Sequence, residues 1–226
     1  MSTVISLCDL TGVFVKPWVE AGYNAVLVDP QHGVRRRERP YPGVVIDKLA
    51  LTVEEAMPIL SEFIRSGEVA FVAGFPPCTD LSGSGARWWA AKRELDYMFQ
   101  AKAVAVAEQC RTIGRLSGAP WLVENPSGAL SRVFGKASHT FHPCDFTELE
   151  PGDNYTKKTC LWTGGGFVMP QPQRDLTLGP PDDRIHKAPP SEQRANFRSA
   201  TPTGFARAVF AANAEPAQPR LFGVGA

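Results

Sequence analysis

Cys78 is the strongest candidate for a reactive residue in this sequence, because it follows the end of a predicted buried strand. The apolar run at 69–73 has the length of an inner parallel strand, and Gly74 with Pro76-Pro77 prevents that strand from continuing. Two consecutive prolines fix two φ angles, so the chain that follows is held stiffly. This position favours a nucleophilic thiol. The alternative is a small cysteine that only packs.

Asp29, Asp47 and Glu124 each stand at the end of another apolar run. The five runs cover 4–8, 24–29, 43–47, 69–73 and 119–123. Helices or long crossovers between them predict an α/β fold with a doubly wound, mostly parallel sheet, whose strands end at one ligand-binding edge. Asp29 suits the two hydroxyls of a ribose and Asp47 suits an adenine amino group, although either could cap a turn instead.

The other segments complete a single predicted domain over residues 1–213. Helices are expected from Phe14 to Gly22, from the capping box at Thr52, continuously from Ala90 to about Ser117, and over 203–213. Residues 159–163 and 167–169 predict an antiparallel hairpin at the far edge of the sheet. Loops are expected at 30–42, at 131–158 and in the proline-rich segment 170–190, and a flexible tail at 214–226.

Composition limits the classes of partner. The chain has 226 residues, 43% of them apolar, and a formal net charge of +1, so any contact with nucleic acid must come from a local basic patch. Arg35-Arg36-Arg37 with Arg39, Arg87, and Lys157-Lys158 are the candidate patches. Five cysteines without a framework spacing, and no signal segment, predict the reducing cytoplasm. No apolar run approaches the roughly 20 residues that span a bilayer, which predicts no membrane partner.

The order of these motifs resembles that of the cytosine-5 DNA methyltransferases, in particular the compact members found in bacterial viruses. The resemblance covers most of the chain. It rests on Asp9-Leu10-Thr11-Gly12 after the first strand, Asp29 after the second, Pro76-Pro77-Cys78-Thr79-Asp80-Leu81-Ser82 after the fourth, Glu124-Asn125-Pro126 after the fifth, Tyr155-Thr156-Lys157-Lys158-Thr159-Cys160, and Arg198 to Ala206 before and in the last helix.

The resemblance implies a Rossmann-like fold that binds S-adenosylmethionine and transfers its methyl group to carbon 5 of a DNA cytosine. Cys78 would attack carbon 6, and Glu124 with Asn125 would hold the base, which must be flipped out or unpaired. The implied cofactor-binding residues are Asp9, Leu10, Thr11, Gly12, Asp29, Pro30, Asp47, Phe75 and Pro77. The implied DNA-binding residues are Pro76, Thr79, Ser82, Arg87, Lys157, Lys158 and Thr203.

Departures from the family pattern keep other functions open. The first motif begins Leu7-Cys8-Asp9, where the family usually has a phenylalanine and a second glycine. The segment 161–202 is too short for the separate target-recognition domain that the family usually has there. A modified donor such as carboxy-S-adenosylmethionine, or a free cytosine nucleotide as acceptor, would use the same covalent chemistry. A noncatalytic DNA-binding protein of the same fold is a further alternative.

A zinc site is an alternative use of four histidine and cysteine side chains. His139, His142, Cys144 and Cys160 supply four possible ligands. Their spacing lacks paired Cys-x-x-Cys knuckles, and Cys160 lies in an apolar run where packing is the usual role. The sequence therefore predicts no metal.

Overall fold

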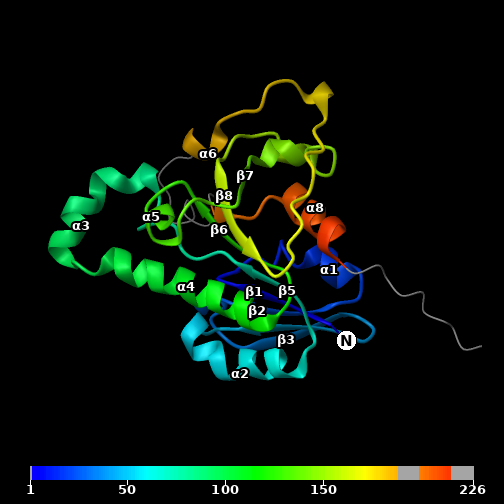
Figure 1. Ribbon diagram of the computed structural model, residues 1–226. Coiled ribbons are helices and arrows are strands. Elements are labelled where there is room, and N and C mark those ends of the chain that lie inside the picture. Colours follow the sequence, from blue (N-terminus) through cyan, green and yellow to red (C-terminus); the bar gives the residue numbers. More distant parts are fainter. Residues whose placement is uncertain (1, 188–198, 215–226) are drawn as a thin grey trace, which may run out of the picture.

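The structure is a computed structural model that describes residues 2–187 and 199–214 (Figure 1). Within these residues eight strands form one sheet in the order β3-β4-β2-β1-β5-β6-β8-β7. The strands are β1 (Thr3–Leu7), β2 (Asn24–Val28), β3 (Arg36–Tyr41), β4 (Val44–Leu49), β5 (Val69–Gly74), β6 (Trp121–Pro126), β7 (His139–Phe141) and β8 (Thr159–Gly164). The five central strands are parallel, and β8 pairs antiparallel with both β6 and β7. The predicted α/β class, with a mostly parallel sheet and a terminal antiparallel pair, is confirmed.

Helices connect the strands and cover both faces of the sheet. The α-helices are α1 (Lys16–Glu20), α2 (Val53–Ser66), α3 (Trp89–Leu95), α4 (Phe99–Ser117), α5 (Leu130–Phe134), α6 (Arg184–Lys187) and α8 (Thr203–Asn213). Short 3-10 helices are η1 (Pro30–His32), η2 (Gly83–Trp88), η3 (Pro143–Phe146), η4 (Pro151–Asp153) and η5 (Leu176–Leu178). No helix among the described residues is long and apolar enough to cross a membrane.

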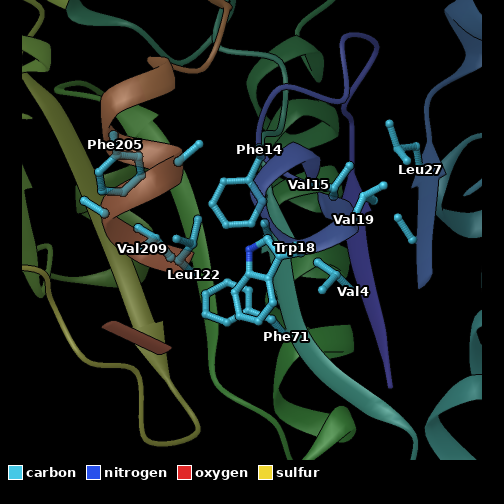
Figure 2. Packing of buried hydrophobic residues seen from close by; sticks show 14 of the residues in the cluster. Val4, Phe14, Val15, Trp18, Val19, Leu27, Phe71, Leu122, Phe205 and Val209 are labelled. Atoms are coloured by element: carbon cyan, nitrogen blue, oxygen red, sulfur yellow. The ribbon is translucent and has the colours of Figure 1, made fainter. Parts of the chain in front are cut away.

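One face of the sheet is covered by α1 and α8, which lie side by side (Figure 2). Trp18 of α1 is fully buried, and its ring lies 5.2 Å from that of Phe71 in β5 and 5.2 Å from that of Phe210 in α8. Phe205 brings α8 into the same apolar cluster as Val4 of β1. The closing helix α8 therefore packs beside the first helix α1.

The opposite face packs against α2 and α4. Ile5 and Val72 of the inner strands meet Leu60 of α2 and Ile113 of α4 in one buried cluster. The α2 helix begins at the predicted capping box, in which the Thr52 hydroxyl accepts a hydrogen bond from Glu55 N. Successive residues of β1, such as Val4 and Ile5, thus face opposite helical layers, as expected for strands buried on both faces.

The loop expected at 30–42 is wrong in part, because Arg36–Tyr41 forms β3. This strand is at the edge of the sheet and largely exposed, so it lacks the apolar pattern that reveals inner strands. Arg37 donates two hydrogen bonds of 2.7 Å to the Asp47 carboxylate on β4, and Lys48 pairs with Glu38. Cross-strand ion pairs therefore hold a strand that buries little apolar surface.

The single helix expected from Ala90 to Ser117 is wrong, because the chain breaks between α3 and α4. Asp96 is extended, with φ −150° and ψ 99°, and its carboxylate accepts a hydrogen bond from Met98 N. An aspartate that bonds to nearby backbone in this way offers an alternative to the helical hydrogen bonds. Leu95 and Met98, which fit the helical spacing, are consequently exposed rather than buried.

The hairpin expected between 159–163 and 167–169 is also wrong, since β7 takes that place beside β8. The β8 strand already pairs with β6 on one side and β7 on the other, so no edge is left for 167–169. Gly165 and Gly166 have positive φ angles and turn the chain away. Val168 instead exchanges backbone hydrogen bonds with the Asn213 side chain at the end of α8. Of the predicted tail 214–226, residues 215–226 lie outside the described residues.

Candidate functional site

A cavity of about 1020 Å³ opens at the carboxyl edge of the sheet. Its floor is at the ends of β1 and β5, where the strand order reverses direction, the place where open α/β sheets bind ligands. The predicted site residues that line it are Asp9, Leu10, Thr11, Asp29, Phe75, Pro76, Pro77, Cys78, Thr79, Ser82, Arg87, Glu124, Lys157 and Lys158. The structure therefore brings candidates from all the central motifs to one cavity.

The turn that carries Cys78 is fixed by both neighbouring strands. Phe75 N donates a hydrogen bond of 2.9 Å to Leu7 O on β1, and Asn125 Nδ2 on β6 donates one of 3.0 Å to Pro76 O. Beyond the turn, the Cys78 carbonyl accepts hydrogen bonds from the backbone N–H groups at 81 and 82. Cys78 is half-buried and lines the cavity. The rigidity expected from the two prolines is thus reinforced by hydrogen bonds.

Glu124 lies on the strand next to Cys78 and faces the same cavity. The β5 and β6 strands are parallel, with Gly74 opposite Val123. Glu124 Oε1 is buried and has no hydrogen-bond partner among the described residues. Burial raises the pKa of the Glu124 carboxyl, and the positive charge of Lys157 opposes that rise. The Glu124 carboxyl therefore keeps its proton to a higher pH than an exposed glutamate does, and in the protonated form it can donate a hydrogen bond to a ligand.

Asn125 has a positioning role that the sequence did not reveal. It is almost fully buried and does not line the cavity. Its side-chain amide donates a hydrogen bond to the Pro76 carbonyl. Its Oδ1 is buried without a partner among the described residues. Because Asn125 joins the end of β6 to the Cys78 turn, it fixes the spacing between Cys78 and Glu124.

The segments after Cys78 and Glu124 are also joined directly. Ser82 and Gly128 form an isolated antiparallel bridge, and Ala129 N donates a hydrogen bond of 2.7 Å to Leu81 O. A Cβ at Gly128 would lie 1.9 Å from Leu81 O. The close approach of the two backbones therefore requires glycine at 128.

Replacing Gly128 with alanine is expected to lower the free energy of unfolding by about 1–3 kcal/mol, because the two backbones must separate. The shift also moves the turn that carries Cys78, so the covalent capture of a cytosine analogue that the resemblance implies should fall together with the Tm. Thermal unfolding and covalent-adduct yield measure both effects. Gly118→Ala is the control for a loss of stability alone. Its φ of +70° disfavours alanine, but a Cβ there has no atom within 4 Å and the residue does not line the cavity, so adduct formation should be unchanged. Adduct formation at the wild-type level in Gly128→Ala would contradict this coupling.

The turn after β1 is built around the Asp9 carboxylate. Asp9 accepts hydrogen bonds from the Ser6 hydroxyl (2.7 Å) and from the backbone N–H groups of Thr11 (3.1 Å) and Gly12 (2.8 Å). Gly12 has φ +71°, which favours glycine, and Cys8 adopts the left-handed region with φ 56°. Asp9 lines the cavity, yet its carboxylate is used to shape the turn, while Gly12 does not line the cavity.

The two acids predicted to contact a nucleoside are placed differently. Asp29 is buried and lines the cavity, and its Oδ1 accepts a hydrogen bond from Gln31 N. Its Oδ2 has no hydrogen bond to the described residues. Asp47 does not line the cavity, because both of its carboxylate oxygens pair with Arg37. The structure thus keeps Asp29 in the site and assigns Asp47 to the β3–β4 pair.

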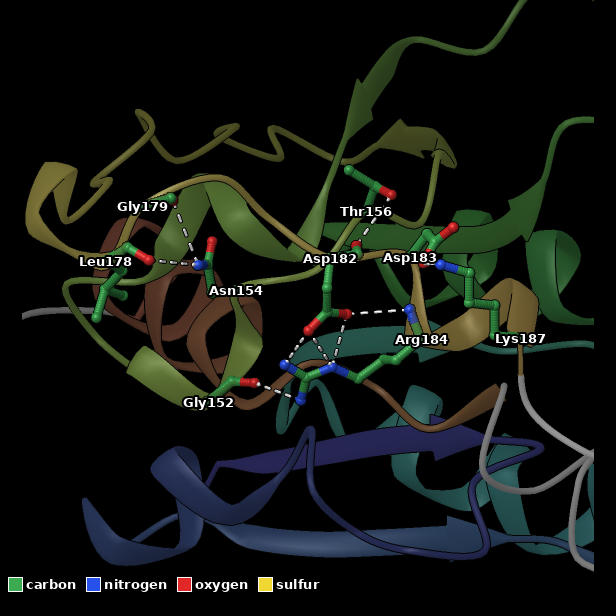
Figure 3. A network of polar contacts seen from close by, with 9 residues as sticks. All are labelled: Gly152, Asn154, Thr156, Leu178, Gly179, Asp182, Asp183, Arg184 and Lys187. Carbon is green, nitrogen blue, oxygen red and sulfur yellow. Dashed lines mark hydrogen bonds and ion pairs between the residues drawn. The ribbon is translucent and has the colours of Figure 1, made fainter.

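Lys157 and Lys158 reach the cavity from the segment before β8. The proline-rich segment is docked beside them (Figure 3). Asn154 Nδ2 donates a hydrogen bond of 3.2 Å to Leu178 O, and Thr156 N donates one of 2.8 Å to the carbonyl of residue 182. The proline-rich segment is therefore attached to the start of the lysine motif.

The docked segment also supplies part of the cavity wall. Arg184 pairs with Asp182, and its guanidinium reaches the Gly152 carbonyl (3.4 Å) (Figure 3). The next residue, Ile185, is buried and lines the cavity. No sequence signal pointed to Ile185, because the motifs that form the rest of the cavity are distant from it in the chain.

Other lining residues were missed at the sequence level, and some predicted ones lie elsewhere. The missed residues are Cys8, Gln31, Ser84, Gly85, Trp88, Lys92, Pro126, Ser127, His142, Thr156, Ile185, Ser199, Ala200 and Thr201. Ser199 to Thr201 belong to the motif before the last helix, whose Arg198 lies outside the described residues. Pro30 and Thr203 do not line the cavity; Thr203 begins α8.

The zinc site considered from the sequence does not form. No three or more His, Cys, Asp or Glu side chains in the described part of the chain lie together in a way that could hold a metal ion. Cys144 and Cys160 are buried, and the Cys160 thiol contacts the Ser127 hydroxyl at 3.5 Å. Packing accounts for both cysteines.

Comparison of the sequence with models of known protein families and with curated protein sequences finds no match. The geometry of the cavity must therefore carry any statement about function.

Proposed function

We propose that the chain is a DNA cytosine-5 methyltransferase that uses S-adenosylmethionine. The observation that carries the proposal is the convergence of Cys78 and Glu124 on one cavity from adjacent parallel strands, with Asn125 joining their two segments. A thiol and a carboxyl of raised pKa that line one cavity are the two groups that covalent activation of a cytosine ring requires.

The residues on the β1–β2 side of the cavity fit a nucleoside donor. Asp29 has a carboxylate oxygen without a hydrogen bond to the described residues, as an acid that accepts from a ribose would. Asp9, Leu10 and Thr11 of the first turn line the same space. Phe75 is in ring contact with Phe14, with the ring centroids 5.4 Å apart. The bound donor would supply an electrophilic methyl group. A cavity of about 1020 Å³ has room for this donor beside a base.

Cys78 and Glu124 would act on the cytosine ring. The Cys78 thiolate forms a bond to carbon 6 while Glu124, in its protonated form, donates to ring nitrogen 3 and accepts from the exocyclic amine. Electron density then moves to carbon 5, which becomes nucleophilic. Transfer to carbon 5 would break the bond between the methyl group and the sulfonium sulfur of the donor, which leaves as a neutral thioether. The proton of carbon 5 then passes to solvent water, its electron pair restores the 5,6 double bond, and the bond between carbon 6 and the Cys78 sulfur breaks to release the thiolate. Lys157, beside Glu124, contributes positive charge where the ring becomes electron-rich.

The target base must leave its stack to enter the cavity. Arg87, Lys157 and Lys158 line the opening and would hold the phosphates on either side of the target nucleotide. None of the five cysteines forms a disulfide. A catalytic thiol of this kind would operate in a reducing cytoplasm.

Incubation of the protein with cytosine-containing DNA and methyl-labelled donor is expected to place label in 5-methylcytosine. Nucleoside mass spectrometry identifies the product, and a heavier group at carbon 5 would reveal a modified donor. Free cytidine nucleotides in a parallel reaction test the small-molecule acceptor. Donor binding without transfer to any of these acceptors would overturn the proposal and favour a noncatalytic binding protein.

A further inference from the structure

The segment at 83–98, here called the arm, exposes an unusual amount of apolar surface. It consists of η2, α3 and the break before α4. Trp88 is 58% exposed, Leu95 90%, Tyr97 79% and Met98 42%. Apolar side chains gathered in this way mark an interaction surface more often than chance exposure does. The arm is therefore a candidate interaction surface.

The arm projects from the body of the protein (Figure 1). Lys92 of α3 pairs with Asp80, and Gln100 Nε2, just after the arm, donates a hydrogen bond of 3.2 Å to Asp80 O. Asp80 is two residues after Cys78. The arm is thus anchored to the turn that carries the thiol, while its apolar residues remain uncovered by the described part of the chain.

Trp88 joins the arm to the cavity. Its side chain lines the cavity together with Arg87, whose guanidinium lies 5.2 Å from the centroid of the Trp88 ring. Arg87 and Arg93 form no ion pair within the described residues, whereas Asp96 is paired with Lys102. An exposed indole beside unpaired guanidinium groups is the combination that binds unpaired nucleotides, by stacking and by contact with phosphate.

We propose that the arm stacks against unpaired bases that flank the target cytosine, so that single-stranded DNA is the preferred substrate. The inference rests on the proposed function, because the cavity next to Trp88 must hold the target base. Bases inside a duplex already stack on each other and present no free face to Trp88 or Tyr97. The helix from 89 to 95 is about 10 Å long, the length of about three stacked nucleotides.

The test measures binding and chemistry separately. Fluorescence anisotropy with a labelled oligonucleotide that contains one cytosine is expected to show at least about tenfold tighter binding of the single strand than of its duplex. Trp88→Ala should weaken single-strand binding by about tenfold or more, with a smaller loss for Tyr97→Ala and partial retention in Trp88→Phe. Leu116→Ala is the matched control, since Leu116 is equally exposed on α4 and lies outside the arm.

Each outcome decides between the two proposals. Binding that depends on Trp88 without methyl transfer by the wild-type protein would leave the arm as a nucleic-acid surface and remove the proposed function. Methyl transfer that is insensitive to Trp88→Ala, or tighter binding of the duplex, would overturn the inference alone. Sedimentation of the wild type as a dimer that Trp88→Ala dissociates would show that a second copy of the chain occupies the arm, and would also overturn it.

Discussion

Replacement of Cys78 by alanine is expected to abolish methyl transfer, with a loss of at least about a thousandfold in kcat. The reason is that carbon 5 of cytosine becomes nucleophilic only while a bond to carbon 6 exists, and no other side chain of the turn supplies a thiolate. A thousandfold loss corresponds to about 4 kcal/mol of transition-state stabilisation. Single-turnover transfer of labelled methyl groups measures it.

A covalent trap separates this role from a structural one. DNA with 5-fluorocytosine cannot lose a proton from carbon 5, so the wild-type protein should remain bound to it through sulfur. Cys78→Ala should form no adduct yet keep its free energy of unfolding within about 1 kcal/mol of the wild-type value, because the side chain is only half-buried. Cys160→Ala is the matched control and should still form the adduct, since Cys160 does not line the cavity. An adduct that survives Cys78→Ala would disprove the assignment.

The central part of this site could be predicted from the sequence because parallel strands end at a common edge. Once the inner strands were identified from their apolar runs, Cys78, Glu124 and Asp29 had to meet there. The same reasoning placed Asp47 in the site. The prediction for Asp47 failed because β3 is an exposed edge strand without an apolar pattern, so the sequence did not reveal it. Arg37 on β3 donates two hydrogen bonds to the Asp47 carboxylate.

The remaining errors have a common physical origin in contacts between segments distant in the chain. A period of three and four residues continued through 95–98, yet the Asp96 side chain bonds to Met98 N and breaks the helix. Nothing local indicates that Asn125 bonds to Pro76, or that residues 178–184 dock on 152–156. Such contacts decide which residues line the cavity and which support it.

Replacement of Glu124 by glutamine is expected to lower kcat by about 10²–10³-fold with little change in KM. Glutamine is isosteric with a protonated glutamate and keeps one donor and one acceptor for the base, so binding is largely preserved. It cannot supply a proton to ring nitrogen 3 as the ring becomes electron-rich. Glu124→Ala should lose both kcat and affinity, because the hydrogen bonds disappear as well.

The pH dependence of the wild type gives an independent check. Burial raises the pKa of the Glu124 carboxyl, so its protonated form persists above the pH at which an exposed glutamate ionises, and kcat should fall as pH rises through the raised value. Glu124→Gln should lack this alkaline limb. A wild-type rate that instead rises with pH over the same range would show that the ionised carboxylate is the active form.

The same burial predicts that function and stability oppose each other at this position. In the unfolded chain Glu124 ionises near pH 4.3, whereas the native carboxyl holds its proton to higher pH, so native stability is lost as pH rises from the first value through the second. Glutamine has no charge to bury. Glu124→Gln should therefore raise the Tm at pH 8 and leave it unchanged at pH 4, with Lys157 limiting the gain because it already offsets part of the penalty. A Tm lowered at both pH values would mean that Glu124 is held for packing rather than for chemistry.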